Sequence, residues 1–166
     1  MRIRVTEGVG TGPTELSAFD QALVRGGIAN YNLIYLSSVL PPGSDVSFST
    51  RPKEPEGRWG DRLYVVMAQN RTSLRNQEVW AGIGWVQAAD GRGLFVRHTD
   101  PSQENVVDMI QTSLGDMTAA RKEKFGPTRF ILQSAKFQEH PACCLVAAVF
   151  RSEGWRNGGA ESPLSH

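Results

Sequence analysis

The sequence predicts one α+β domain, built from two helices and several strands. Two segments carry apolar residues at helical spacing, Glu15–Arg25 and Gln103–Lys124. Shorter segments alternate polar and apolar residues or are apolar throughout, which is typical of strands. A chain of 166 residues with 40% hydrophobic residues has the size and composition of a single globular domain. We expect antiparallel strands stacked as two sheets, with the two helices outside them.

The N-terminal part predicts a strand, a loop and a helix, in that order. Charged and apolar residues alternate over Arg2–Val5, as in a half-buried strand. The glycines of Glu7–Pro13 predict a loop. Thr14 is a good N-cap for the helix Glu15–Arg25, and Gly26 is a good stop.

One face of this first helix is apolar, and an acidic residue lies close to it. Leu16, Phe19 and Leu23 share the apolar face. At about 100° per residue, Asp20 falls inside or beside this arc. A carboxylate in that position needs a partner, which is either local backbone and solvent or a bound ligand.

The later elements follow from the same patterns. Asp100 as cap, Pro101 and a capping-box Gln103 predict the start of the second helix. Its apolar stripe consists of Val106, Val107, Ile110, Leu114 and Met117. The remaining strands are expected at Val46–Ser49, Arg62–Ala68, Val79–Ala88, Gly93–His98, Thr128–Phe137 and Cys143–Phe150, the last buried on both faces. Residues 1–152 then form the domain, and residues 153–166 form a disordered tail.

Charge and hydropathy exclude several functions. A net charge of +1 gives no electrostatic case for binding nucleic acid or an anionic membrane. No apolar run is long enough to span a bilayer, and the N-terminal residues are too few and too polar for a secretory signal. No metal-ligand pattern stands in the sequence, so we expect no metal. Cys143 and Cys144 are adjacent, should point to opposite faces of a strand, and are most simply core residues of a cytoplasmic protein.

The most informative stretch is Gly26–Pro42. Its apolar run, Asn32–Leu36, favours a strand, which we expect to be buried, and Pro41–Pro42 ends the segment because proline cannot donate to a β-ladder. Two adjacent serines, Ser37 and Ser38, stand between them. A serine pair at the end of a buried strand is unusual unless the hydroxyls act chemically, although taken alone it also fits a serine-rich turn.

The pattern around these serines resembles the self-cleavage site of the pyruvoyl-dependent arginine decarboxylases. The shared features, in chain order, are Ala18-Phe19-Asp20, Gly27-Ile28, Asn30 to Ile34, Ser37-Ser38, and a hydrophobic pair before Pro41-Pro42. A weaker likeness continues through Gly93-Leu94 and the strand Cys144–Phe150. The resemblance implies a four-layer αββα sandwich with antiparallel sheets, assembled as a homotrimer with the active site between protomers.

The resemblance also implies self-processing and a cofactor. Ser38 Oγ attacks the carbonyl carbon of Ser37 and converts the peptide bond into an ester, and elimination then leaves fragments 1–37 and 38–166. What remains of Ser38 hydrolyses to a pyruvoyl group and ammonia. A serine hydroxyl is a weak nucleophile, so a strained turn at the pair would help. The pyruvoyl carbonyl forms a Schiff base with the substrate amine. It then serves as the electron sink when CO2 leaves.

Three further residues take their roles from the resemblance. The residue that matches Asn32 orients the pyruvoyl group and the substrate. Asn30 shares the face of Asn32 on an extended chain and is placed with the substrate. Asp20 receives the guanidinium of arginine, which a carboxylate can bind through two hydrogen bonds. Both asparagines could instead be turn residues at the start of a strand.

One residue of the family pattern is missing. The family's decarboxylases carry a glutamate, the proton donor, shortly after a Gly-Leu-hydrophobic-hydrophobic strand. The corresponding segment here is Gly93–His98, which has no carboxylate, so the position belongs to Arg97 or His98. His98 titrates near neutral pH and could replace the acid. Arg97 stays protonated and could instead bind a substrate carboxylate, or both could be ordinary surface residues.

The sequence therefore predicts a self-processing, pyruvoyl-dependent amino acid decarboxylase. Its default reaction is arginine to agmatine and CO2, a step of polyamine biosynthesis. The missing glutamate leaves two alternatives open. One is decarboxylation of a different amino acid or guanidino compound, and the other is a non-cleaving structural or regulatory homologue.

Overall fold

The computed structural model describes residues 1–48 and 55–155. In chain order the elements are β1 (Arg2–Thr11), α1 (Glu15–Arg25), β2 (Asn32–Tyr35), β3 (Val39–Leu40), β4 (Asp45–Phe48), β5 (Arg62–Thr72), β6 (Glu78–Gln87), β7 (Gly93–Asp100), α2 (Gln103–Ala119), β8 (Arg129–Lys136) and β9 (Ala142–Glu153). The predicted α+β class is confirmed. Neither helix in the described ranges combines the length and apolarity needed to cross a membrane.

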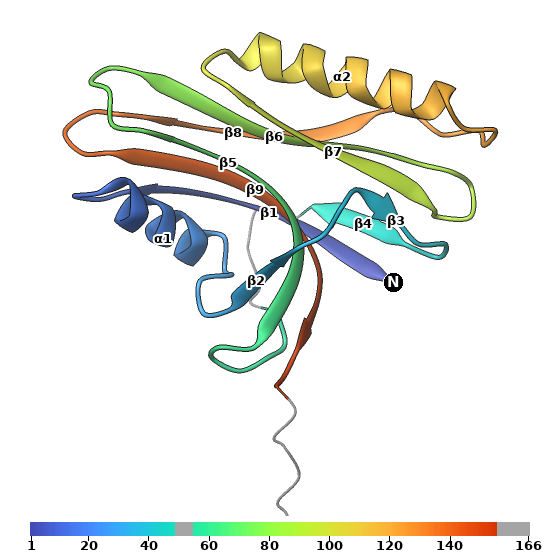
Figure 1. Ribbon diagram of the computed structural model, residues 1–166, viewed down its shortest axis with the longest axis horizontal. Coiled ribbons are helices and arrows are strands. Elements are labelled where there is room, and N and C mark those ends of the chain that lie inside the picture. The colour runs from blue at the N-terminus through green and yellow to red at the C-terminus, as the bar shows by residue number, and fades with distance from the viewer. Residues whose placement is uncertain (49–54, 156–166) are drawn as a thin grey trace, which may run out of the picture.

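The strands form two sheets that stack face to face, with one helix on each outer side (Figure 1). The five-stranded sheet has the order β2-β5-β9-β1-β4, and the four-stranded sheet has the order β3-β7-β6-β8. Paired strands run antiparallel except for β2 with β5 and β1 with β4. This arrangement is compatible with an αββα sandwich.

Three groups of buried apolar side chains hold the layers together. The central group lies between the sheets and includes Ile3, Val66, Ile83, Phe95 and Val146. The second joins α1 to the five-stranded sheet, and the third joins α2 to the four-stranded sheet through Val106, Ile110 and Leu114. Removal of this apolar surface from water is the main favourable term that stacks the layers.

β1 continues through the segment whose glycines predict a loop. Gly8 and Gly10 are strand residues that pair with β9 and lie beneath α1. A Cβ atom on Gly8 would lie 2.0 Å from the carbonyl oxygen of Ala22, and one on Gly10 would lie 2.2 Å from that of Ala18. These glycines therefore permit the close approach of the helix rather than a turn. The loop prediction for Glu7–Pro13 is wrong for all but its last two residues.

α1 begins and ends as predicted, but its buried face matches the predicted one only in part. The Thr14 hydroxyl accepts a hydrogen bond from the backbone N–H of Ser17, and Gly26 caps the other end. Leu23 is buried as predicted, together with Ala18 and Ala22, and Phe19 is partly buried beside them. The third predicted residue, Leu16, is 69% exposed. Small side chains face the sheet because the glycines of β1 bring the helix so close.

The other elements differ from the predictions mainly at their ends. β5 extends to Thr72, four residues beyond the predicted end of this strand at Ala68. Ser102, not Asp100, is the N-cap of α2, and this helix ends at Ala119 rather than near residue 124. Along β9, residues 142 to 149 are buried on both faces, as predicted. The end of the predicted strand at Ser49, and residues 156–166 of the predicted tail, lie outside the described residues.

Candidate active site

The serine pair lies where the chain crosses from one sheet to the other. β2 pairs with β5, and the backbone N–H of Leu36 continues that ladder by donating to the carbonyl oxygen of Val65 at 2.9 Å. Two residues later, the carbonyl oxygen of Ser38 accepts a hydrogen bond from the N–H of Phe95 at 2.7 Å, next to the pairing of β3 with β7. The Ser37–Ser38 peptide bond therefore bridges the two sheets.

Both serines are accessible, and their hydroxyls make no structural bond. Ser37 is exposed and Ser38 is half-buried. Neither hydroxyl has a hydrogen-bond partner among residues 1–48 and 55–155, whereas the nearby Ser44 hydroxyl donates to the carbonyl of Pro41. The preceding strand is an exposed edge strand, with Tyr35 53% exposed, so the prediction of a buried strand is wrong.

Arg97 and His98 contact opposite sides of the four-stranded sheet. Arg97 Nη1 donates to the carbonyl oxygen of Leu36 at 3.3 Å and so reaches the residue before the serine pair. His98 Nε2 lies 2.9 Å from Ser113 Oγ on α2. Burial against the helix lowers the pKa of His98. Within one protomer the structure therefore brings Arg97, and not the imidazole of His98, to the serine pair.

A pocket of about 360 Å³ lies at the end of β2, where Tyr35 lines it two residues before the serine pair. It is lined by Tyr35 from β2, Met67, Ala68 and Gln69 from β5, and Arg97, His98 and Thr99 from β7. No lining residue is acidic. Partial burial raises the pKa of the Tyr35 hydroxyl, against the opposing effect of the Arg71 and Arg97 guanidinium groups. The pocket is thus cationic and suits a carboxylate better than a second cation.

The two asparagines hold the start of β2. The Asn32 side-chain amide donates to the carbonyl oxygen of Gly60 at 2.6 Å, and the carbonyl of Asn30 accepts from the N–H of Gly60. An extended chain places Asn32 and Leu36 roughly 13 Å apart, with the serine pair farther on. Neither asparagine is therefore brought to the serine pair of its own protomer.

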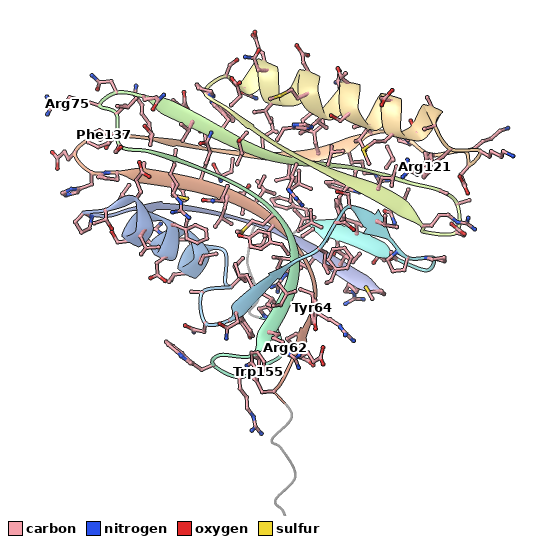
Figure 2. The ribbon with its side chains drawn as sticks, viewed as in Figure 1. Arg62, Tyr64, Arg75, Arg121, Phe137 and Trp155 are labelled. Atoms are coloured by element: carbon pink, nitrogen blue, oxygen red, sulfur yellow. The ribbon has the colours of Figure 1, made fainter. Side chains whose placement is uncertain are left out.

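An ion-paired cluster supports this end of β2. The Arg62 guanidinium pairs with Glu153 at 3.1 Å and lies 4.7 Å from the centre of the Trp155 ring, while the Tyr64 hydroxyl donates to Glu153. Figure 2 shows Arg62, Tyr64 and Trp155 together where β5 and β9 project beyond the sandwich. The Trp155 indole also donates to Gly60, the residue that Asn32 binds.

Asp20 lies on a different layer from the serine pair. It is exposed on α1, which covers the outer face of the five-stranded sheet. Its carboxylate makes no hydrogen bond or ion pair with the described part of the chain. The neighbouring Phe19 ring lies 4.2 Å from the Arg71 guanidinium. Asp20 is therefore exposed and unengaged by the described residues.

Sequence reasoning missed Tyr35 and Phe95. Phe95 acts through its backbone N–H, which every residue except proline carries, so no residue type marks it. Tyr35 lies in the run Asn32–Leu36, where its apolar ring is explained by strand formation alone. Only the pairing of β2 and β7 with their neighbours identifies these two as parts of the site.

Comparison with known proteins agrees with this geometry. Residues 2–154 match the family model described as pyruvoyl-dependent arginine decarboxylase. A protein of that name from Halobacterium salinarum is 34% identical over 156 residues, which are 92% of this chain and 96% of the relative. A protein of the same description from Archaeoglobus fulgidus is 28% identical over 86% of this chain and 91% of the relative. One from Methanothermobacter thermautotrophicus is 51% identical over 54% of this chain and 56% of the relative.

The fold and the serine pair thus define a class of decarboxylase enzymes that depend on a pyruvoyl group. More narrowly, the chain belongs to the pyruvoyl-dependent arginine decarboxylase family. The resemblance drawn from the segment Ala18–Pro42 is confirmed.

The residues at the serine pair fit the family's pyruvoyl group. Ser38 is half-buried, and its hydroxyl makes no hydrogen bond within the part of the chain that the structure describes. The strand that follows it, β3, pairs with β7. A group made from Ser38 would therefore stay attached to the four-stranded sheet through β3. Ser37 would stay with β2 in the five-stranded sheet.

Proposed function

We propose that the chain cleaves itself between Ser37 and Ser38 and then decarboxylates arginine to agmatine and CO2. The observation that carries this proposal is the position of the serine pair on the bridge between two sheets, in a chain of the pyruvoyl-dependent family. Both serines are accessible, and no described residue bonds to their hydroxyls. When present, the pyruvoyl group supplies the electron sink for loss of CO2.

The fold can hold both fragments together after cleavage. Fragment 1–37 would keep β1, α1 and β2, and fragment 38–166 would keep the rest. β1 pairs with β9 over eight residue pairs, and β2 pairs with β5. Because these ladders and the buried groups of both sheets cross between the fragments, cleavage should leave one folded protomer.

The complete site is proposed to lie between protomers of a homotrimer in the four-layer αββα arrangement. Asn32 is too far along β2 to reach the serine pair of its own chain, and Asp20 lies on the outer layer. Two strand edges are open beside the pocket: among the described residues, β5 is unpaired on the β2 side beyond Val65, and β7 on the β3 side beyond Phe95. Open edges of this kind are suited to contact with another chain.

The remaining roles follow from chemistry and position. Asp20 of a neighbouring protomer would bind the substrate guanidinium, and Asn30 and Asn32 would orient the substrate. Arg97 lines the cationic pocket and would bind the substrate carboxylate before it leaves as CO2. His98 stays the proposed proton donor, although in this protomer its imidazole lies against α2.

Mass spectrometry under denaturing conditions tests the cleavage. The wild type should give two fragments that break between Ser37 and Ser38, with the larger one blocked to Edman sequencing. Ser38→Ala should remain a single chain, while Ser44→Ala, which removes a nearby hydroxyl, should still cleave. A wild-type chain that stays whole after long incubation contradicts the proposal.

A second candidate function is favoured by one observation, the absence of a carboxylate at both Arg97 and His98, one of which occupies the position of the family's glutamate. The missing glutamate favours either a different amino acid or guanidino substrate, or a non-cleaving homologue with a structural or regulatory role. A screen of amino acids and guanidino compounds for CO2 release separates these cases. Release from another compound but not from arginine makes the default substrate wrong. A cytoplasmic location and a role in polyamine synthesis stay predictions.

A further inference from the structure

We propose that Arg97 is a positioning residue for the self-cleavage of this chain. Its guanidinium holds the carbonyl of Leu36, so that both ends of the Ser37–Ser38 peptide unit are fixed while the unit itself stays free to deform. This inference rests on the proposed self-cleavage. It gives Arg97 a role before any substrate is present, distinct from the binding of a substrate carboxylate.

The residue before the serine pair is held in three ways. The Leu36 N–H donates to Val65, its carbonyl oxygen accepts from Arg97 Nη1 at 3.3 Å, and its side chain packs against the core between the sheets. Of the two hydrogen bonds, only the one from Arg97 comes from the four-stranded sheet. Arg97 therefore links the β2 end of the bridge to the sheet that carries β3.

The residue after the bond is held from the same strand as Arg97. Phe95, two residues earlier in β7, donates its N–H to the Ser38 carbonyl at 2.7 Å. Leu40, 1% exposed, then fixes β3 against the core. By contrast, the Ser37 carbonyl accepts no hydrogen bond from residues 1–48 or 55–155. The carbonyl that must be attacked is thus free to leave planarity, while its neighbours on both sides are anchored to β7.

The self-cleavage reaction needs a Ser37 carbonyl that is free to deform between neighbours that are fixed. Ser38 Oγ bonds to the Ser37 carbonyl carbon, the C–N bond breaks, and the Ser38 nitrogen takes up the proton that the hydroxyl gives up. Loss of the Ser38 α-proton then breaks the Cβ–Oγ bond of Ser38, forms the Cα=Cβ double bond and releases Ser37 as a carboxylate that keeps this oxygen. Water adds to the remaining dehydroalanine, and ammonia leaves. Positioning of the two reacting atoms is the part of this barrier that fixed neighbours can lower.

The charge of Arg97 suits each stage of this sequence. A guanidinium has five N–H donors, and only one bond, to Leu36, engages them in the described chain. The free donors are one residue away from the carbonyl that gains negative charge and from the carboxylate that is released. A glutamate at this position could not donate to Leu36 when ionised and would repel that carboxylate.

The test is a time course of cleavage in freshly synthesised full-length chain, followed by denaturing mass spectrometry. Arg97→Met should slow cleavage about fivefold, as expected for loss of one solvent-exposed hydrogen bond of ordinary strength. Arg97→Lys should restore most of the rate, because it keeps a charged donor. Arg129→Met, which changes an exposed arginine on β8 of the same sheet, should cleave at the wild-type rate. Because Arg97 is exposed, its variants should have the same melting temperature as the wild type.

Two outcomes overturn the inference and are distinguishable. If the wild type cleaves and Arg97→Met cleaves equally fast, only the role of Arg97 is wrong and the proposed function stands. If the wild type never cleaves, the proposed function and this inference fail together.

Discussion

Arg97 and His98 are neighbours on β7, yet their side chains reach opposite layers of the molecule. Arg97 Nη1 lies 3.3 Å from the Leu36 carbonyl oxygen at the bridge between the sheets, and His98 Nε2 lies 2.9 Å from Ser113 Oγ on α2. Successive side chains of a strand alternate between its two faces. The family's glutamate position corresponds to one of these two residues. If it is Arg97, the position lies at the bridge between the sheets; if it is His98, it lies against α2.

The first prediction concerns the pH dependence of stability at His98. Burial lowers the pKa of the folded-state imidazole below its ordinary value of 6.5. The unfolded chain then binds more protons than the folded one, so stability is full above about pH 6.5 and declines as the pH falls through that value. We expect the free energy of unfolding, measured in urea, to fall more steeply below about pH 6.5 for wild type than for His98→Gln.

The same variant tests the proposed proton donor. If His98 is the proton donor, His98→Gln should still cleave at the wild-type rate but should release CO2 from arginine about 100-fold more slowly. Turnover close to wild type would show that His98 is not the donor, in keeping with the contact of its imidazole with Ser113 on α2. In the stability measurement, the free energy of unfolding could also fall equally steeply with pH for wild type and for His98→Gln. That result would show that His98 is not desolvated in the folded state.

The second prediction concerns the close contact of β1 with α1. A Cβ on Gly10 would lie 2.2 Å from the carbonyl oxygen of Ala18, which is backbone and cannot move aside. Gly10→Ala should lower the free energy of unfolding by about 3 kcal/mol through overpacking. The matched control is Gly115→Ala on α2, where a Cβ meets nothing within 4 Å. That change should raise stability by about 0.5–1 kcal/mol through helix propensity. Equal effects of both changes would be inconsistent with the packing described.

The third prediction concerns the adjacent thiols. Burial raises the pKa of Cys143 to about 11 and that of Cys144 to about 12. A thiol reacts as its thiolate, so the folded chain should be inert to an alkylating reagent at about pH 8. Two thiols per chain should react in concentrated guanidinium chloride. Rapid labelling of the folded protein, read by intact mass, would show that β9 opens more readily than its burial suggests.

The fourth prediction tests whether the site is shared between protomers. Asp20→Ala should cleave but bind arginine poorly, and Ser38→Ala should not cleave. If Asp20 and Ser38 of one site come from different chains, co-assembly of the two inactive variants restores about one quarter of the sites by random mixing. Release of CO2 from arginine measures this recovery. If the mixture stays as inactive as its parts while the variants do co-assemble, Asp20 and Ser38 do not belong to one shared site.

Local patterns predicted much of this molecule. The bounds of α1, the burial of β9 and the opposite faces of Cys143 and Cys144 follow from caps and from the two-residue period of a strand, which act over a few neighbours. The serine pair was found because its surroundings from Ala18 to Pro42 resemble one family. These features need no knowledge of distant segments.

Other features depended on contacts between distant parts of the chain. The glycines of β1 predict a loop by composition, but the packing of α1 makes them strand. The same residue type serves a turn or a close approach, and only the neighbouring layer distinguishes the two.

The sequence by itself determined the family, the mixed class of the fold and the position of the serine pair, because each is encoded in residues close together along the chain. Only the tertiary structure decided that the Ser37–Ser38 bond spans two sheets and that Arg97, rather than His98, faces it. Those facts arise from hydrogen bonds of β2 with β5 and of β7 with the bridge, which join residues up to 61 positions apart. Pairing over such separations leaves no local pattern in the sequence.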